Sequence, residues 1–376
     1  MTSDEHIAIR PFVPEDQDAV ARIARRSFSA LWARLIVPGP DDFVATVDNR
    51  VAGAVLLNAN LTDLPGQGRV GRIAWLFTDP DYRGRGLARQ LVKQGVEQLR
   101  AQGCGPVVTE VEGYNTPSAN IFHELGFRRL GTMDQVRWLG VAGALLLGLR
   151  TNRLFTPGYF LWALDVPGRP ASPAVQRAGT WTLNVFITLL ALLLGGGLLL
   201  PGGPVMPGAS EMLAVIVAVV LLLGLREGAM QIAARMQGLK LEFRGWGSGA
   251  AVSALIAVLF GKVFLLPGSC YPPGDGWHYH QFRRQLALSA AAGTSMVVIL
   301  FLSALVLPAQ VPEGFAPMIA GNIVEIGIAL ILFDSMIAFE PFQGYNARRM
   351  LDYSRTLWIA FASIVAVIYV FVVILG

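Results

Sequence analysis

The chain has 376 residues, of which 53% are hydrophobic and 15% charged, and its formal net charge is +4. Its mean hydropathy of +0.51 is too high for an ordinary soluble protein. The lysines and arginines form no run with interleaved aromatic residues, which argues against a nucleic-acid-binding protein. The two cysteines, Cys104 and Cys270, lie in different halves of the chain and predict no disulfide framework.

Charged and apolar residues separate along the chain. Residues 1–137 hold most of the charges, whereas long apolar runs follow Trp181. Runs of about 18 apolar residues or more are typical of transmembrane helices. The opening MTSDEHIAIRPFVPEDQDAV is acidic and lacks the apolar core of a signal peptide. We therefore expect a cytoplasmic head at 1–137, a linking or interfacial segment at 138–179, and a multi-pass domain in the cell membrane at 180–376.

Within the head, the segment GRIAWLFTDPDYRGRGLARQLVKQGVEQLRAQG predicts a strand, a turn and a helix, because apolar residues after the turn recur at helical spacing. Two glycines in the turn RGRGLA let successive backbone N–H groups point at one spot, and the helix that follows adds its positive end. This arrangement predicts an anion site, and the alternative is a plain turn. The apolar helix positions are Leu87, Leu91, Val92, Val96 and Leu99.

Two motifs resemble one enzyme family. DPDYRGRGLARQLV resembles the acetyl-CoA pyrophosphate loop of the GNAT N-acetyltransferases, Arg/Gln-x-x-Gly-x-Gly/Ala, with Arg83, Gly86 and Ala88 at the matching positions. Further on, TEVEGYNTPSANIFHELGFRRLG resembles the second signature of that family, a strand ending in Glu-Val, an Asn, and a helix closing on Leu-Gly-Phe. With IAIRPFVPEDQDAVARIARRSF as the first strand and helix, the resemblance covers residues 6 to about 137. It implies an α/β fold with a mixed sheet flanked by helices.

The resemblance also implies acetyl-CoA as co-substrate. The strand before the loop would pair with the pantetheine arm, and the loop amides would hold the pyrophosphate. Asn115 would lie near the cofactor, and Phe122 stands where many members have a tyrosine general acid, so it has no proton to give. The implied cofactor-binding residues are Leu76, Phe77, Thr78, Arg83, Gly84, Arg85, Gly86, Leu87, Ala88, Asn115 and Phe122.

Glu110 is the expected catalytic base. An amine that attacks a thioester must lose a proton, so a base or a water chain is needed. Glu110 stands at the Glu of the Leu-Glu-Val strand motif, which acts as general base in the branch of the family that acetylates protein N-termini. The alternative is that Glu110 points into solvent from a strand edge. The nearby Glu112, Tyr114 and His123 receive no role from the sequence.

The basic residues predict the membrane topology. The linkers 201–210 and 308–318 contain no basic residue. If 250–266 crossed the membrane, the positive-inside rule would be reversed for three loops. If 250–266 instead enters and returns, every basic loop lies in the cytoplasm. We therefore expect five transmembrane helices, a re-entrant segment at 250–266 with a cavity beside it, and a C-terminus on the side opposite the head. The basic residues concerned are Arg226, Arg235, Lys240, Arg244, Lys262, Arg283, Arg284, Arg348, Arg349 and Arg355.

The membrane domain resembles a second family. LREGAMQIAARMQGLKLEFRGWGSG, LFGKVFLLPGSCYPPGDG, LALSAAAGTSM and LILFDSMIAFEPFQGYNARRM resemble, in this order, landmarks of the site-2 proteases. That family binds zinc with His-Glu-x-x-His and a later Asp before Gly. The matching positions hold Arg226, Glu227, Met230 and Gln343.

This departure from the protease motif implies a domain without zinc and without proteolysis, because neither Arg nor Met suits a hydrolytic zinc site. Arg226 would neutralise Glu227 or Glu340. His278 and His280 fall in a loop and cannot rebuild the site by themselves. The alternative is an unrelated helical bundle.

Together these features predict a membrane-tethered N-acetyltransferase with a protease-like but inactive membrane domain. The acceptor would be an amine on a protein terminus, a lysine or a small molecule, and the partners would be membrane lipid and a partner transmembrane helix. The alternative is an acetyl-CoA sensor with weak or no turnover. Phe122 favours the sensor, whereas Glu110 favours the enzyme. An active intramembrane protease would need metal ligands that the motif lacks.

Overall fold

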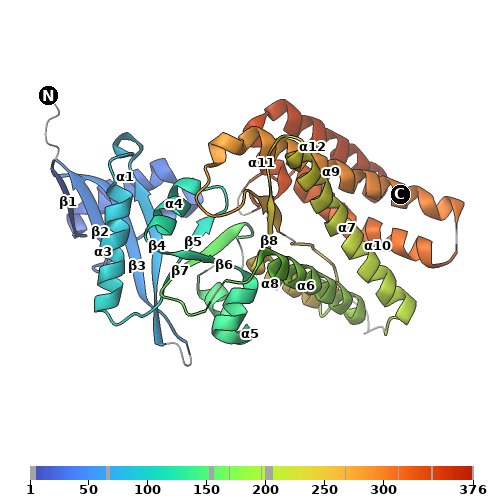
Figure 1. The fold of residues 1–376 in the computed structure, drawn as a ribbon, viewed down its shortest axis with the longest axis horizontal. Coiled ribbons are helices and arrows are strands. Elements are labelled where there is room, and N and C mark those ends of the chain that lie inside the picture. Colours follow the sequence, from blue (N-terminus) through green and yellow to red (C-terminus); the bar gives the residue numbers. More distant parts are fainter. Residues whose placement is uncertain are drawn as a thin grey trace.

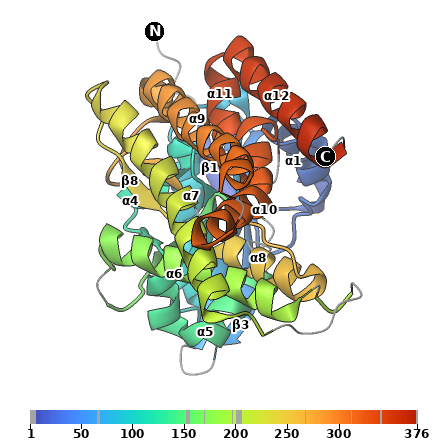
Figure 2. The same cartoon turned by 90° about the vertical axis from the view of Figure 1, so that its right-hand side faces the viewer.

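The computed structural model describes residues 6–64, 68–151, 156–168, 170–195, 197–199, 206–266, 268–311, 313–339 and 342–374. An α/β head and a helical body lie next to each other along the longest axis (Figure 1). The body is a bundle of long helices that stands in front of the head when viewed from the C-terminal side (Figure 2).

The head is built on a seven-stranded sheet with the order β1-β2-β3-β4-β5-β7-β6. Neighbouring strands are antiparallel except β4 and β5, which are parallel. This mixed sheet confirms the predicted fold class. The strands are β1 (Ile7–Pro11), β2 (Phe43–Val47), β3 (Arg50–Leu64), β4 (Gly68–Thr78), β5 (Val107–Glu112), β6 (Arg128–Leu130) and β7 (Tyr159–Leu164).

Strand β7 belongs to the segment 138–179, which the sequence predicts as a linker. It lies between β5 and β6 and pairs with both. The sheet of the head is therefore completed by residues beyond 137, and α5 (Thr132–Arg150) forms a helical excursion between β6 and β7.

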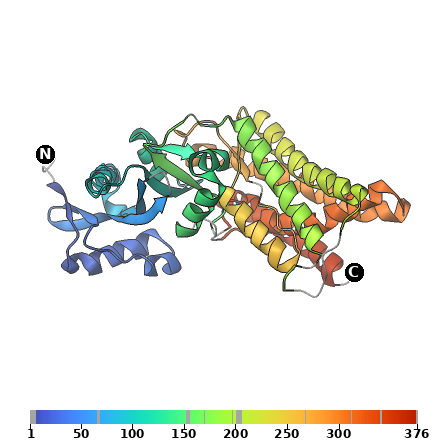
Figure 3. The same cartoon turned by 90° about the horizontal axis from the view of Figure 1, so that it is seen from below.

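Helices cover both faces of the sheet. Figure 3 shows α1 (Gln17–Ser27) and α2 (Ala30–Arg34), in blue, on one face, and α3 (Leu87–Ala101), in cyan, on the other. The five apolar positions predicted for α3 are at most 7% exposed. They pack in one core with Val55 of β3, Ile73 of β4 and Val107 of β5, which confirms the predicted helix face. Helix α4 (Thr116–Glu124) follows β5.

The parallel strands β4 and β5 diverge after a short contact. They pair only at Gly71 with Val107 and at Arg72 with Val108. Immediately beyond, Leu56 opposes Trp75 while Leu57 opposes Ile73, so β4 bulges at residue 74. From there β4 continues against β3, and β5 continues against β7. The strands open a gap in the sheet at their carboxyl ends.

The body contains five helices that are long and apolar enough to cross a membrane, in the part of the chain that the structure describes. Their number and order agree with the predicted helical domain. They are α6 (Pro173–Leu194), α7 (Ala209–Arg235), α9 (Tyr279–Gln310), α10 (Phe315–Ser335) and the span Arg355–Val372, which contains α12 (Arg355–Tyr369). The short helix α11 (Asn346–Tyr353) precedes α12.

The short apolar helix α8 (Gly247–Phe260) lies where the sequence predicts a re-entrant segment. The strands on either side of it, β8 (Glu242–Arg244) and β9 (Ser269–Tyr271), pair antiparallel. The chain therefore leaves this largely buried strand pair after β8 and returns to it at β9. That 250–266 enters the membrane and returns instead of crossing stays a prediction.

Candidate active site

The turn between β4 and α3 carries two glycines in the left-handed region. Gly84 has φ 81° and Gly86 has φ 77°, a conformation that residues with a Cβ seldom adopt. A Cβ at either position would meet no atom within 4 Å, so the glycines serve the backbone path and leave open space. The first amides of α3, at Leu87 and Ala88, have no intrahelical acceptor. An exposed turn that leads into a helix N-terminus is suited to bind an anion.

Helix α1 fastens the segment that leads into this turn. Arg26 donates to Asp79 at 2.7 Å and to Asp81 at 3.0 Å. Asp79 also accepts from the backbone N–H of Asp81 at 3.0 Å. The predicted pantetheine-pairing residues, Leu76 to Thr78, directly precede this segment at the end of β4, on the side where the strand has diverged from β5.

Glu110 lies close to the point where the strands diverge. Its side chain is 8% exposed, and its Oε2 accepts from Nε of Arg72 at 2.9 Å. The Nη2 of Arg72 also donates to the backbone carbonyl of Thr151, after α5, at 3.1 Å. The alternative in which Glu110 points into solvent is therefore wrong. The carboxylate is held by a guanidinium in the interior of the head.

A hollow of about 270 Å³ is lined by residues next to Arg72 in the sheet, although neither Arg72 nor Glu110 lines it. Asn58, which lines it, pairs in register with Arg72, and Ala74 and Trp75 follow Arg72 along β4. Asp41 and Asp42 form its acidic side. The lining combines these polar groups with Leu35, Val37, Leu56 and Leu57, so the hollow can hold a small molecule with a polar and an apolar part.

Asp42 belongs to the wall of the hollow. Its two oxygens accept from the backbone N–H groups of Gly39 and Leu57, each at 2.7 Å. Burial raises the pKa of its carboxyl, although these two N–H groups oppose the change. Asp41 instead is exposed and accepts from the amide of Gln102 at 2.8 Å. The hollow therefore presents Asp41 as its carboxylate open to solvent.

Two of the predicted cofactor residues have local structural contacts. Asn115 caps α4, since its Oδ1 accepts from the N–H of Ser118 at 3.3 Å. Phe122 is 2% exposed and packs edge to face on Phe127, with ring centroids 5.1 Å apart. Phe122 thus lies in the core of the head, in one cluster with Leu87 of α3, and its role at the cofactor stays a prediction.

Glu112 is a titrating group that the sequence left without a role. It lies two residues after Glu110 on β5, so both side chains are on the same face of the sheet. Burial raises the pKa of the Glu112 carboxyl to about 7, although nearby backbone N–H groups and Arg348 oppose the change. A carboxyl that titrates near neutrality is suited to proton transfer. In the sequence, the pattern Glu-x-Glu at the end of the strand could have indicated that Glu112 lies beside Glu110.

The end of β5 is inserted into the body. The hydroxyl of Tyr114 accepts from Nε of Arg349 at 2.7 Å and donates to the carbonyl of Gly344 at 3.3 Å. Arg349 is fully buried and lies over the ring of Tyr114 and over that of Tyr271, at 5.3 and 5.0 Å. Helix α11, which carries Arg349, is thereby fixed to the strand that carries Glu110 and Glu112.

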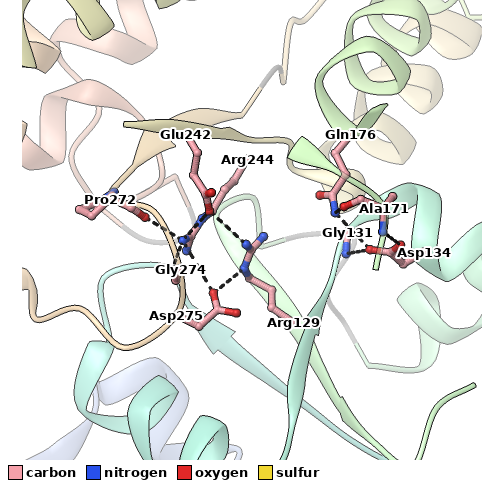
Figure 4. A network of polar contacts seen from close by, with 10 residues as sticks. All are labelled: Arg129, Gly131, Asp134, Ala171, Gln176, Glu242, Arg244, Pro272, Gly274 and Asp275. Atoms are coloured by element: carbon pink, nitrogen blue, oxygen red, sulfur yellow. Dashed lines mark hydrogen bonds and ion pairs between the residues drawn. The ribbon is translucent and has the colours of Figure 1, made fainter. Parts of the chain in front are cut away.

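Two polar networks join β6 and α5 to the body (Figure 4). Arg129 of β6 contacts Asp275 at 3.0 Å and Glu242 of β8 at 3.4 Å, and Arg244 binds Glu242 from the body side at 2.9 Å. In the second network Asp134 of α5 accepts from the backbone N–H of Ala171 at 2.6 Å. Head and body are therefore joined by buried polar contacts in addition to the linking chain.

At the positions that the sequence analysis matched to the protease motif, the charge pairing differs from the prediction. Arg226 is paired with Asp334 of α10, with Nε to Oδ2 at 2.6 Å and Nη2 to Oδ1 at 2.8 Å. Glu227 is instead paired with Arg177 of α6 at 2.8 Å, and Glu340 lies outside the described residues. The expected neutralisation of Glu227 by Arg226 is wrong, because adjacent residues on a helix point in different directions.

Polar side chains complete the surroundings of this buried pair. Asn346 donates from Nδ2 to Asp334 at 3.0 Å and to Thr294 at 3.3 Å, and Arg226 donates to the carbonyl of Gly268 at 3.2 Å. Met230 is fully buried beside Asn346, with its sulfur 4.0 Å from Nδ2. Among the described residues no group of three or more His, Cys, Asp and Glu side chains could hold a metal ion.

Comparisons with known proteins agree with the fold of the head. Residues 6–127 match the family described as Acetyltransferase (GNAT) family. A mycothiol acetyltransferase of Saccharopolyspora erythraea is 31% identical over 140 residues, which are 34% of this chain and 45% of that protein. The L-methionine sulfoximine/L-methionine sulfone acetyltransferase of Pseudomonas aeruginosa is 36% identical over 100 residues, 25% of this chain and 58% of that protein.

The chain spans about half the length of these curated relatives. Among solved structures, N-acetylglutamate synthase from Neisseria gonorrhoeae, complexed with coenzyme A and N-acetyl-glutamate, is 16% identical. The match covers 44% of this chain and 36% of the synthase chain. Its TM-score of 0.32 supports no conclusion about function.

Proposed function

We propose that the GNAT acetyltransferase domain in the N-terminal region transfers the acetyl group of acetyl-CoA to an amine, and that the body holds this domain at a membrane. The observation that carries the proposal is the glycine turn at the start of α3 beside the diverging strands β4 and β5. The glycine turn suits a pyrophosphate, and the free edge of β4 suits an extended arm that pairs with it like an added strand.

The residues of the chain divide the chemistry among them. Backbone amides from Arg83 to Ala88 would hold the pyrophosphate, and the edge from Leu76 to Thr78 would align the pantetheine arm. The amine nitrogen attacks the thioester carbon, the carbon–sulfur bond breaks, and CoA leaves as the thiolate. Glu110 is the proposed acceptor of the amine proton.

Arg72 would position Glu110 during this reaction. It holds one carboxylate oxygen through Nε at 2.9 Å and is itself anchored to the carbonyl of Thr151. A carboxylate fixed in this way has a defined direction toward the opening between the strands. The same contact favours the sensor alternative if the guanidinium prevents Glu110 from taking a proton, so turnover decides between the two.

The acceptor that fits best is a small amine. The hollow beside Arg72 has the size of a small molecule and an acidic wall that would attract an ammonium group. The two relatives described above carry the names of small-molecule acetyltransferases. A protein terminus or a lysine side chain is the alternative acceptor.

The membrane location is supported by the five long apolar helices and by α5. Val141, Leu145 and Leu149 are 63%, 46% and 51% exposed, and their spacing places them along one side of the helix. Arg137 and Arg150 flank them, and α5 contacts α6 and α8 at the boundary between head and body. We propose that this stripe lies in the membrane surface on the cytoplasmic side, which would make α5 the interfacial part of segment 138–179.

The membrane domain is proposed to be a protease-like fold without protease chemistry. Arg226 and Asp334 saturate each other where the protease motif would hold metal and water, with Asn346 closing one side. Zinc analysis of the purified protein tests this. One zinc per chain that is lost on Glu227→Gln would contradict it.

One assay tests the catalytic proposal. The purified full-length protein is incubated with acetyl-CoA and a panel of small amines, polyamines and peptides, and released CoA is measured. We expect release that depends on one class of amine. Saturable acetyl-CoA binding with no release across the panel would favour the sensor.

Topology is tested separately. A reporter fused after Gly376 is expected on the side opposite the head, since five crossings are odd. A cytoplasmic reporter would mean that 250–266 crosses the membrane.

A further inference from the structure

The tip of the re-entrant segment lies against the loop between α6 and α7. The backbone N–H groups of Leu198 and Leu199 donate to the carbonyls of Val258 and Leu259, both at 2.9 Å. These bonds satisfy carbonyls at the end of α8 that have no partner within the helix. The end of α8 is thereby held at a defined position, and Lys262 follows it by two residues.

Lys262 forms an ion pair with the middle of a long apolar helix. Its Nζ is 3.2 Å from Oε1 of Glu325, the eleventh of the 21 residues of α10. At 1.5 Å per residue, Glu325 lies about 15 Å from either end of that helix. The two side chains remain 66% and 60% exposed. Because the end of α8 is bonded to the loop after α6, and Gly195 at the end of α6 lines the same space, the pair lies level with the end of that helix, where a lipid headgroup can reach it. Ionisable groups beside apolar helices are associated with functional sites.

A crevice of about 370 Å³ lies behind the ion pair. Helix α10, with Asn322, Glu325 and Ile326, forms one side. Helix α6, with Thr188 and Leu192, forms the other side together with Phe260 at the end of α8 and Val263 just after it. The exposed part of the lining, the mouth of the crevice, therefore carries a cation and a carboxylate, whereas the buried part is mainly apolar, with Ala191 and Ile326 beside Thr188.

We propose that this crevice binds a membrane lipid whose headgroup carries both a phosphate and a primary amine. Lys262 would bind the phosphate in place of the Glu325 carboxylate, and Glu325 would bind the ammonium group in place of Lys262. Each side chain would thus keep a partner of opposite charge. The apolar interior would hold the first part of an acyl chain. The inference rests on the proposed membrane location of the body and is independent of the acetyl acceptor.

The chemistry of the mouth favours this headgroup over others. A headgroup with an anion alone would leave Glu325 without a counter-charge once Lys262 turns to the ligand. A quaternary ammonium would neutralise Glu325 but has no N–H to donate, so it would lose a charge-assisted hydrogen bond. A zwitterion with a primary amine satisfies both side chains.

The test uses the purified full-length protein in a non-ionic detergent. Short-chain phosphatidylethanolamine, phosphatidylcholine and phosphatidylglycerol are titrated by isothermal calorimetry, and phosphoethanolamine without chains serves as the soluble probe. We expect saturable binding of phosphatidylethanolamine, at least about tenfold tighter than phosphatidylcholine, the usual effect of one hydrogen bond to a charged group. Phosphoethanolamine should bind far more weakly, because it lacks the apolar part.

Two variants separate the roles of the charges. Lys262→Met should weaken all three lipids, since each has a phosphate. Glu325→Gln should remove the preference for phosphatidylethanolamine over phosphatidylcholine and strengthen binding of phosphatidylglycerol, because no carboxylate is then left without a counter-charge. Glu313→Gln, the same change of charge in the loop before α10, is the matched control and should leave every affinity unchanged.

Several results would overturn the proposal. Equal binding of the three lipids with no effect of either variant would mean non-specific detergent-like association. Tight binding of phosphoethanolamine alone would indicate a soluble ligand. Loss of a dimer in Glu325→Gln would identify the mouth as a contact between copies of the chain. Separating cell membranes from the soluble fraction tests the proposed membrane location independently. If the protein is not recovered with the membranes, the proposed location of the body is wrong.

Discussion

The head and the body each contain a buried guanidinium–carboxylate pair, and their surroundings differ. In the head, Arg72 and Glu110 are 17% and 8% exposed and lie at the strand divergence, and Asn58, the strand partner of Arg72, lines the hollow. In the body, Arg226 and Asp334 are 2% and 0% exposed, and the pair is bonded further to Gly268 and Asn346. The first pair has space beside it for a reacting molecule, whereas the second fills its own site.

This difference separates a pair that can work in chemistry from one that holds helices together. A buried ion pair contributes little net stability when both partners are present, but an unpaired member is very unfavourable. The body pair joins α7 to α10 across a sequence separation of 108 residues. Its expected role is therefore to fix the packing of these helices, while the head pair fixes the direction of one carboxylate.

The largest effect is expected for Asp334→Ala. It leaves Arg226 buried without a counter-charge, so the free energy of unfolding should fall by about 3–5 kcal/mol. The fall is measured as a lower Tm of the detergent-solubilised protein. Glu124→Ala, which removes an exposed pair with Arg89, is the control and should change stability by at most about 1 kcal/mol.

The double variant Arg226→Leu with Asp334→Leu sharpens this test. Removing both charges should recover most of the loss, because the penalty comes from the unpaired charge. A double variant as unstable as Asp334→Ala would show that the pair itself, with its hydrogen bonds to Asn346 and Gly268, stabilises the body. That result would assign the body pair more than a packing role.

The second prediction concerns Glu110→Gln. The amide keeps the shape of the side chain, so acetyl-CoA binding should remain close to normal, while turnover should fall by about a hundredfold or more through loss of the general base. The fall should shrink at high pH, where more of the amine is already deprotonated. Initial rates of CoA release across pH measure it, with Glu97→Gln on the exposed side of α3 as control. An unchanged rate would assign proton removal to water or to Glu112.

Gly86→Val is expected to affect binding of acetyl-CoA. A side chain at this position would crowd the phosphates, and its positive φ is unfavourable for a β-branched residue. Gly103, with φ 81° just past the other end of α3, has the same conformation and equally open surroundings. Gly103→Val should lower stability by a similar amount. Only Gly86→Val should raise the Kd for acetyl-CoA, by about tenfold or more, and equal binding by both variants would reject the loop as the phosphate site.

Local pattern was enough to predict the turn, α3 and its buried face, because periodicity and glycine placement act over a few residues. Local pattern could not place β7. Its six residues, YFLWAL, join the sheet by pairing with β5 and β6, which only the chain path after α5 makes possible. The partner of Arg226 was missed for the same reason. Asp334 is far away in sequence, whereas Glu227 is adjacent in sequence but points elsewhere on the helix.

The Arg72 contact of Glu110 and the raised pKa of Glu112 also required the fold. Both depend on what covers β5, namely the end of α5 for Glu110 and α11 for Glu112. The family resemblance identified Glu110 as the candidate base. It could not show that a guanidinium holds the Glu110 carboxylate. The lining of the hollow comes from the two strands β3 and β4 and from the segment after α2, which only the three-dimensional arrangement brings together.

The last prediction is a dependence of stability on pH that comes from Glu112. Burial raises its folded pKa to about 7, above its ordinary value, so the folded state binds more protons than the unfolded state between about pH 4.5 and 7. Stability should therefore decrease as pH rises through this window, by about 1.4 kcal/mol for each unit of pKa difference.

Glu112→Gln removes the titrating proton and should flatten the decrease, which thermal unfolding at pH 5, 6 and 7 measures. Glu97→Gln, on the exposed side of α3, should keep the slope of the unmodified protein. If Glu112→Gln keeps that slope as well, another group is responsible for the titration and Glu112 is ionised throughout. It would then resemble the permanently charged pair of the body more than a group that can exchange a proton.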